Sequence, residues 1–290
     1  MFKRKERHIT DNEAIRTLPH SRKEVFFDLL SHRKMNLFAL SCLTFVFFIP
    51  LAVDLFFFNY LEVVAISNEK YDYLFSLIFY SMLIMVPCMV IGFLGFGGAF
   101  QVAKKMVWQE GIVLNADFFQ GVKENAKHSI MNGLIFGVLL FGLIVGGSYL
   151  LIFMQSNAIL CGVGIGALIV LFLFFGMSIS LFYTQDVYYS NKYIDTLKNS
   201  FRFLGLTNWK TFVLFLLSTG SLVALCSLNM ITLGIGLFLF AILNSVVIIL
   251  YTLIAHAAFD KYINAEHYPD MVGKGLYKEK KIEESLDKEA

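Results

Sequence analysis

Residues 157–183 read NAILCGVGIGALIVLFLFFGMSISLFY, and none of these side chains is charged. A helix of about 20 apolar residues crosses the hydrocarbon core of a bilayer, which is roughly 30 Å thick. A single strand is excluded as an alternative, because lipid offers no hydrogen-bond partner to the open edge of a sheet. The segment therefore predicts a transmembrane α-helix.

Five other segments share this length and apolar character. Hydrophobic residues make up 57% of the 290-residue chain and charged residues 16%, whereas soluble domains average about 45–50% apolar and about 25% charged residues. The sequence predicts an all-α polytopic membrane protein. Its six transmembrane helices are expected at residues 36–58, 73–100, 130–153, 157–183, 211–230 and 233–259.

Lysine and arginine are distributed unevenly between the segments that join these spans. The segments before residue 36, at 101–129, at 184–210 and after 259 hold 23 of the 24 basic residues, whereas 59–72 holds only Lys70. Because basic loops remain in the cytoplasm, we expect both termini of this multi-pass protein to be cytoplasmic.

The spans also define the domain organisation. We expect a cytoplasmic N-terminal segment with an amphipathic helix at 1–35, a six-helix transmembrane domain at 36–260 and a cytoplasmic tail at 261–290. The tail mixes charges and contains few aromatic residues, which is typical of a solvated segment.

Short amphipathic helices are predicted before each odd-numbered span, at 22–30, 118–130 and 193–205. In each of them the apolar residues gather on one side of the helix and the charged residues on the other. Two interpretations remain open: the helices lie in the headgroup plane and anchor the spans, or their polar faces bind a cytoplasmic partner. The candidate interface residues are Phe118, Phe119, Val122, Lys123, Lys127, Leu197, Lys198, Phe201 and Arg202.

Polar side chains inside the spans are few. The candidates for an intramembrane polar site are Asp54, Asn132, Asn244 and His256. Ionisable residues inside a membrane often mark a functional site, although Asp54 lies close enough to the outer end of its span to be solvated there. No acidic residue lies near the middle of a predicted span, which argues against a proton-coupled pump.

Sequence motifs for enzyme or cofactor chemistry are missing. There is no GxxxxGK(S/T), HExxH or GxSxG, and each of the four cysteines lies in an apolar run without a CxxC spacing. We therefore expect a non-enzymatic protein with no catalytic residues, no cofactor and no metal ion. A net charge of +2 gives no electrostatic support for nucleic-acid binding.

Several short motifs carry a resemblance to a known family. They are Asn36-Leu37-Phe38, Pro50, Pro87 with Gly92, the stretch VAKKMVWQE at 102–110, and Asp117-Phe118-Phe119 followed by Lys123, Asn125 and Lys127. With a weaker match at Asn199 and Trp209, the chain resembles the YesL-like family of bacterial membrane proteins, a domain of unknown function. It departs from the family pattern at Phe93–Gly98 and at Trp108-Gln109.

The resemblance implies a protein of the bacterial plasma membrane. Family members are often encoded beside carbohydrate-uptake ABC transporters. We expect an accessory or regulatory subunit of such a transporter, with the lipid bilayer and the permease or ATPase subunits as partners. Two alternatives remain open: a small-solute transporter or channel in its own right, and a membrane enzyme acting on lipid or glycan. The resemblance supplies no catalytic or binding residues.

Overall fold

The computed structural model of the protein describes residues 19–68, 73–153, 157–189, 191–220 and 229–276. Every regular element in these ranges is a helix, and no strand occurs among them. Within these ranges, five helices are long and apolar enough to cross a membrane. The all-α fold class predicted from the sequence is therefore confirmed.

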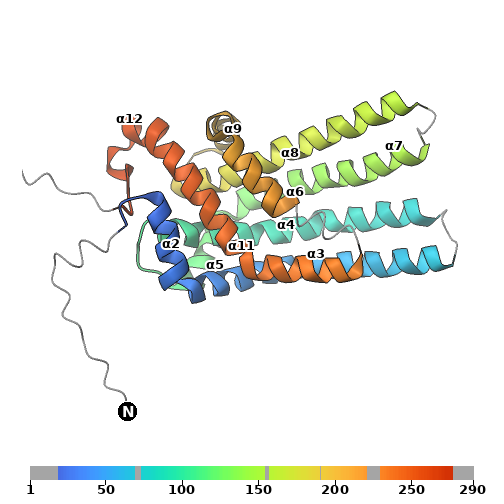
Figure 1. Cartoon of the computed structure of the whole chain (residues 1–290), viewed down its shortest axis with the longest axis horizontal. Helices are drawn as coiled ribbons and strands as arrows, with labels where there is room; N and C mark the ends of the chain where they lie inside the picture. Colours follow the sequence, from blue (N-terminus) through green and yellow to red (C-terminus); the bar gives the residue numbers. More distant parts are fainter. Residues whose placement is uncertain (1–18, 69–72, 154–156, 190, 221–228, 277–290) are drawn as a thin grey trace, which may run out of the picture.

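The first two spans form a long helical hairpin (Figure 1) of α3 (Lys34–Ser67) and α4 (Leu74–Val107). Each helix has 34 residues, which gives about 50 Å at 1.5 Å per residue, against roughly 30 Å for a hydrocarbon core. α3 continues past its predicted end at residue 58, because residues 59–67 contain neither Pro nor Gly.

The third and fourth spans form the second hairpin. α6 (Ala126–Phe141) continues through the π-helical turn η2 (Gly142–Gly146) into α7 (Gly147–Phe153), which lies beside α8 (Ala158–Tyr188). Asn157 caps α8, since its side chain accepts a hydrogen bond from the Leu160 N–H at 3.1 Å. Most of the turn predicted between these spans lies outside the described residues.

Two more long helices complete the bundle. α9 (Tyr193–Phe215) continues into the π-helical turn η3 (Leu216–Gly220), and α11 (Met230–Phe259) starts with a capping box in which Asn229 and Thr232 exchange hydrogen bonds. The predicted fifth span is helical as far as Gly220, and residues 221–228 lie outside the described ranges. A sixth crossing of the membrane therefore stays a prediction.

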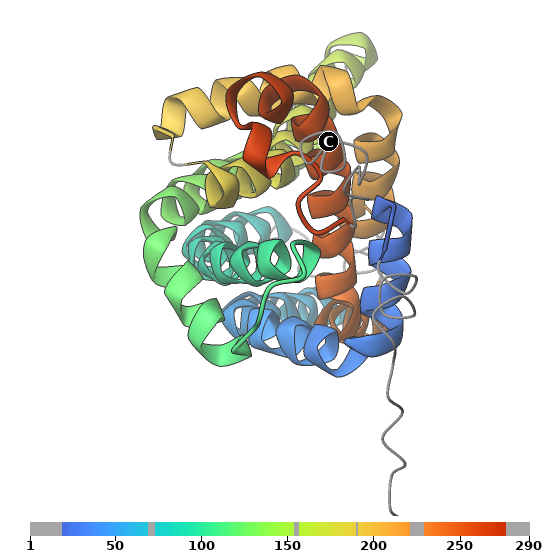
Figure 2. The ribbon, with the colours of Figure 1, turned by 90° about the vertical axis from the view of Figure 1, so that its left-hand side faces the viewer.

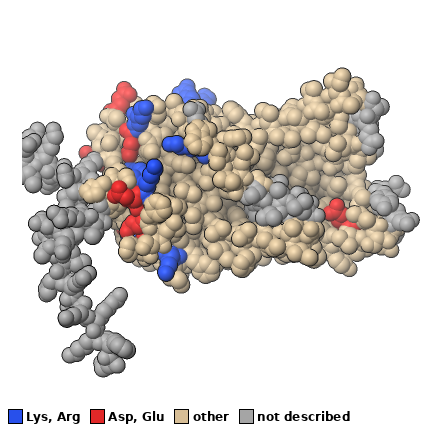
Figure 3. Space-filling model, viewed as in Figure 1, with Lys and Arg blue, Asp and Glu red and all other residues tan. Residues whose placement is uncertain are grey.

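Short helices gather at one end of the bundle, which we call the charged end; the opposite end, where α3 joins α4 and α7 joins α8, is the hairpin end. Figure 2 views the charged end directly, and Figure 3 shows Lys and Arg gathered over it. Its short helices are α2 (Arg22–His32), α5 (Leu114–Glu124), η4 (Asp260–Asn264), α12 (Ala265–His267) and η5 (Pro269–Met271).

The amphipathic segment predicted at 118–130 is not one helix, because the chain turns at Asn125 between α5 and α6. The amide of Asn125 is buried and donates to the carbonyl oxygen of Gly121 at 2.9 Å. The same carbonyl oxygen also accepts the backbone N–H of Asn125 at 3.0 Å, and the ψ of 7° at Asn125 departs from the helical value and ends α5. The segment predicted at 193–205, by contrast, is the first half of the longer helix α9.

Aromatic rings fill the middle of the bundle. Five long helices contribute one ring each to a continuous series, and α4 contributes two. The centroids of successive rings lie 5.0–6.0 Å apart. Edge-to-face and tilted pairs at this spacing are favourable. We call this series the aromatic chain: Phe240, Phe48, Phe96, Phe93, Phe136, Phe172 and Phe215.

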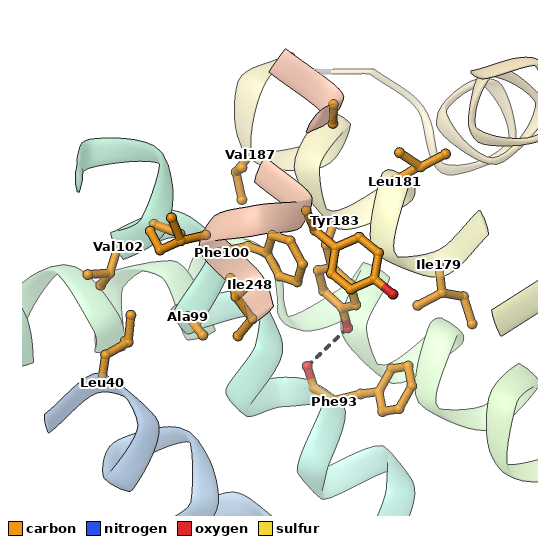
Figure 4. Packing of buried hydrophobic residues seen from close by; sticks show 14 of the residues in the cluster. Leu40, Phe93, Ala99, Phe100, Val102, Ile179, Leu181, Tyr183, Val187 and Ile248 are labelled. Carbon is orange, nitrogen blue, oxygen red and sulfur yellow. Dashed lines mark hydrogen bonds between the residues drawn. The ribbon is translucent and has the colours of Figure 1, made fainter. Parts of the chain in front are cut away.

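Glycines make room for this packing. A Cβ on Gly92 would lie 2.6 Å from the Phe48 ring, and one on Gly133 would lie 2.6 Å from the Cα of Val90 in α4. Figure 4 shows the buried layer next to the aromatic chain, where the Tyr183 hydroxyl donates to the Phe93 carbonyl oxygen at 3.0 Å. Close backbone approach through glycine is typical of helix pairs in membranes.

Candidate functional site

Four side chains form a hydrogen-bonded cluster at the charged end, which we call the latch: Arg22, Trp108, His256 and Asp260. The Arg22 guanidinium lies 2.9 Å from the Asp260 carboxylate, which lies 3.1 Å from Nδ1 of His256. The indole N–H of Trp108 donates to Nε2 of His256 at 2.9 Å. The latch thus joins α2, the end of α4 and the end of α11.

The hydrogen bonds of the latch use both ring nitrogens of His256, which is fully buried. An indole N–H is only a donor, so Nε2 of His256 accepts and carries no proton. Nδ1 of His256 lies 2.7 Å from the Arg22 guanidinium and 3.1 Å from the Asp260 carboxylate, and Arg22 pairs with the same carboxylate. Both ring nitrogens therefore have partners, and His256 bridges Trp108 to the Arg22–Asp260 pair.

Residues 268–276, which we call the strap, fold back over the latch. The Lys274 ammonium lies 3.6 Å from the centroid of the Trp108 ring and 3.0 Å from the Glu110 carboxylate. The carbonyl oxygen of Lys274 accepts a hydrogen bond from Arg22 at 2.9 Å. Gly275 has φ +84°, and a Cβ at this position would collide with the carbonyl oxygen of Val107, so the close approach requires glycine.

A further pair of hydrogen bonds leads from the latch to a cavity. The side chain of Asn264 donates to Asp260 at 2.9 Å and accepts from the Tyr189 hydroxyl at 2.6 Å. Tyr189 is buried, and its ring lies 5.3 Å from the ring of Tyr268. Both tyrosines line the cavity, so its wall is connected to the latch through Asn264.

This cavity, the charged-end cavity, has a volume of about 400 Å³ and lies between α9 and the segment that follows α11. Small-molecule sites occupy roughly 300–1,000 Å³, so the volume is large enough for one. Aromatic and polar side chains share its surface. Six of the lining residues are Tyr189, Tyr262, Tyr268, Asn199, Arg202 and His267.

A second polar cluster ties α6, α8 and α9 together at the same end. Nδ1 of His128 lies 2.6 Å from the carboxylate of Asp186, and the His128 ring lies 5.4 Å from the ring of Tyr193. The Tyr193 hydroxyl donates to Asn132 at 2.9 Å. Burial raises the pKa of Tyr193 to about 12, so this hydroxyl keeps its proton at neutral pH.

The predicted interface residues divide into two groups. Phe118 is fully buried, and its ring lies 5.8 Å from that of Phe47 in α3, so it cannot contact a partner. Phe201 is half-buried and stacks on Phe174 at 4.9 Å, while Val122 and Leu197 are also half-buried. The exposed members are Phe119, Lys123, Lys127, Lys198 and Arg202.

The four predicted intramembrane polar residues do not form one site. Asp54 is half-buried and accepts a hydrogen bond from Ser81 at 3.4 Å, Asn132 belongs to the second polar cluster, and His256 belongs to the latch. Asn244 is buried on α11, and its side-chain N–H has no partner in the described part of the chain.

The other latch residues were not predicted as site residues. Arg22 belongs to the first amphipathic segment and Trp108 to a stretch that carries the family resemblance, but their convergence on His256 depends on tertiary packing. Asp260 offered the clearest local pattern, because it lies four residues after His256 on one helical face.

The class of protein follows from these features: the chain is an all-α, multi-pass membrane protein with a polar, hydrogen-bonded end. Its described residues include no group of three or more metal-ligating side chains. No protein-family model, curated protein or solved structure matches the chain. The resemblance to the YesL-like family therefore stays a prediction.

Proposed function

We propose that the protein is a non-enzymatic accessory subunit that binds a cytoplasmic-side partner through its charged end. Following the family resemblance, the partner is the permease or ATPase of a carbohydrate-uptake ABC transporter in a bacterial plasma membrane. In this proposal six helices cross the membrane, and both termini lie in the cytoplasm. α5 and the first half of α9 lie at the inner membrane surface.

The observation that carries this proposal is the contrast between the middle of the bundle and the charged end. The aromatic chain occupies the middle with apolar rings from all six long helices. The exposed basic residues and the charged-end cavity lie at one end. A solute path needs polar lining groups, whereas a docking subunit needs a rigid anchor and an exposed polar face.

The exposed face that we propose for docking comprises Phe119 and Lys123 on α5, Lys127 on α6 and Lys198 on α9. Phe119 is 55% exposed, and an exposed aromatic residue beside basic side chains is typical of interaction surfaces. The contact between His128 and Tyr193 places the start of α6 beside the start of α9, so these residues share one end of the bundle.

Co-purification of the tagged full chain from its own cells in a mild detergent tests the proposal. We expect transporter permease or ATPase subunits to be recovered with the wild type. The double variant Lys123→Glu/Lys127→Glu reverses two charges on the proposed face and is expected to lose them, because like charges across an interface repel. Recovery of the wild-type chain alone would contradict the proposal.

The matched control reverses two lysines elsewhere at the same end. Lys23 on α2 and Lys34 on α3 are both exposed, and Lys23→Glu/Lys34→Glu changes the net charge by the same amount. We expect this control to keep the partner. Equal loss in both double variants would indicate attraction by overall charge and not by a specific face.

A small-solute transporter is the second candidate, favoured by the buried polar groups of α3 and α11. The Ser41 hydroxyl accepts a hydrogen bond from the Ser245 N–H at 2.9 Å. Asn244 directly precedes Ser245, and its side-chain amide N–H has no partner among the described residues. Proteoliposomes containing the purified chain would take up solute if this candidate is correct, and Asn244→Leu would reduce the uptake.

A further inference from the structure

The charged-end cavity is lined by one arginine and one histidine. Arg202 on α9 and His267 on α12 both line it. Neither has a hydrogen bond or an ion pair with any residue that the structure describes. A guanidinium is always charged and presents planar N–H donors that match phosphate oxygens. An unpaired arginine in a concave site therefore favours an anionic ligand.

The remaining lining groups are suited to the same ligand. Asn199 and the hydroxyls of Tyr262 and Tyr268 supply neutral donors, because the Tyr189 hydroxyl already donates to Asn264. The three tyrosine rings supply flat apolar surface. No aspartate or glutamate is among the described lining residues. Glu266 and Asp270, which are close to them in sequence, are exposed, and Asp260 is paired with Arg22 in the latch. The cavity thus combines one fixed positive charge with donors and contains no acid to repel an anion.

The position of the cavity relates it to the membrane surface. Leu206, which lines it, is 46% exposed, and Trp209, one helical turn further along α9, is 67% exposed. Exposed tryptophan beside apolar residues is typical of the boundary between lipid and water. A ligand in the cavity could therefore come from the water or from the headgroup layer.

From these observations we propose that the charged-end cavity binds the phosphate group of an organic phosphate ester, with Arg202 and His267 contacting the phosphate and the tyrosine rings contacting the organic part. A soluble phosphate ester and a phospholipid headgroup share this chemistry. None of the four residues of the partner face proposed above lines the cavity: Phe119, Lys123 and Lys127 lie on other helices, and only Lys198 shares α9 with Arg202. Its wall is joined to the latch through Tyr189 and Asn264.

Binding of two probes to the purified full chain in a neutral detergent tests the proposal. Glycerol 3-phosphate is titrated by calorimetry, and retention of short-chain phosphatidylglycerol against phosphatidylcholine is measured by native mass spectrometry. We expect saturable binding of at least one probe. Arg202→Gln is expected to weaken it about tenfold or more, because the charge-assisted hydrogen bonds to phosphate are lost.

The control is Lys210→Gln, which removes an exposed positive charge from the same helix, α9, without touching the cavity. Binding of glycerol 3-phosphate that Arg202→Gln weakens and Lys210→Gln preserves supports a soluble ligand. If only the binding of phosphatidylglycerol shows this pattern, the result supports a phospholipid headgroup as the ligand. Equal weakening in both variants, or no saturable binding of either probe, overturns the proposal.

A second variant guards against misfolding of Arg202→Gln. His267 is exposed on the three-residue helix α12 and makes no side-chain hydrogen bond or ion pair with any residue that the structure describes. His267→Gln is therefore expected to fold normally and to weaken binding of the same probe. Unchanged binding in this variant, with Arg202→Gln unfolded, would also overturn the proposed contacts.

Discussion

The charged end and the hairpin end of this molecule are held together by different interactions. At the charged end, residues distant in sequence exchange directed hydrogen bonds, such as Trp108 with His256 and Arg22 with Asp260. Toward the hairpin end the helices meet through apolar contacts and leave wide faces open. Only 6% of the most apolar part of α8 is buried, against 39% for the segment Met230–His267, which includes α11.

The two ends of the molecule are suited to different roles. Faces left open toward the hairpin end are apolar, and lipid covers such faces in a membrane without cost. Polar groups at the charged end have specific partners, and buried polar groups are favourable only when those partners are present. We infer that the hairpins anchor the protein, while the charged end carries the part of the structure that binds other molecules.

The largest effect is expected from a larger side chain at the contact between α4 and α6. Gly133→Val places atoms against the backbone of Val90, which a side-chain rotation cannot relieve. We expect a loss of about 3 kcal/mol or more in unfolding free energy. A thiol-reactive dye that reports exposure of the buried Cys88 during heating measures it.

Gly166→Val on α8 is the matched control, because nothing lies within 4 Å of a Cβ at that position. Its thermal midpoint is expected to stay near that of the wild type. An equal loss in both glycine variants would show that the open face of α8 is packed as tightly as the inner helices, and the comparison would fail.

A smaller effect is expected from removing the ion pair of the latch. Arg22→Gln leaves Asp260 partly buried without its cation, since the two side chains are only 14% and 18% exposed. We expect a loss of about 2 kcal/mol, below the full cost for a completely buried pair. The same heating experiment measures it.

His32→Gln is the control for Arg22→Gln, because it removes the ion pair with Asp28 on the same helix, in which His32 is 74% exposed. Exposed pairs contribute about 1 kcal/mol or less, so little change is expected. If Arg22→Gln lowers the unfolding free energy as little as this control does, the latch does not hold α2 in place.

The smallest effect is expected from Trp108→Phe, which removes the N–H that His256 accepts but keeps an aromatic ring. A buried acceptor left without its donor costs about 1–2 kcal/mol. The control is Trp209→Phe, where the side chain is 67% exposed, and the dye-based midpoint is expected to be unchanged. A loss of stability in the control as large as that in Trp108→Phe would contradict a stabilising role for the hydrogen bond between Trp108 and His256.

Features set by local sequence were predictable, whereas those set by tertiary contacts were not. The apolar run at 157–183 predicted α8 closely, because length and composition alone decide a membrane span. The break at Asn125 was missed, since the apolar periodicity of residues 118–130 continues through it. The exposed basic residues of α5 were predicted, but the burial of Phe118 against α3 and α4 was not, because amphipathicity does not reveal what covers the apolar face.

The residues of the candidate site were likewise predictable only where the local sequence marked them. His256 was singled out because an ionisable residue in an apolar segment is unusual, and Arg202 because it lies on the polar face of an amphipathic segment. The latch and the charged-end cavity depend on helices that are far apart in the chain, and no periodicity in one helix predicts which residues of another will meet it. Arg22 and Trp108 therefore became visible only in the folded structure.

The orientation of the charged end can be measured directly by labelling intact cells with a membrane-impermeant maleimide. Two single-cysteine variants in a background without the native cysteines place the probe at Lys123 on the charged end and at Asn68 after α3 on the hairpin end, both exposed. We predict labelling of Asn68→Cys in intact cells, and of Lys123→Cys only after the cells are broken. Labelling of Lys123→Cys in intact cells would contradict a charged end that faces the cytoplasm.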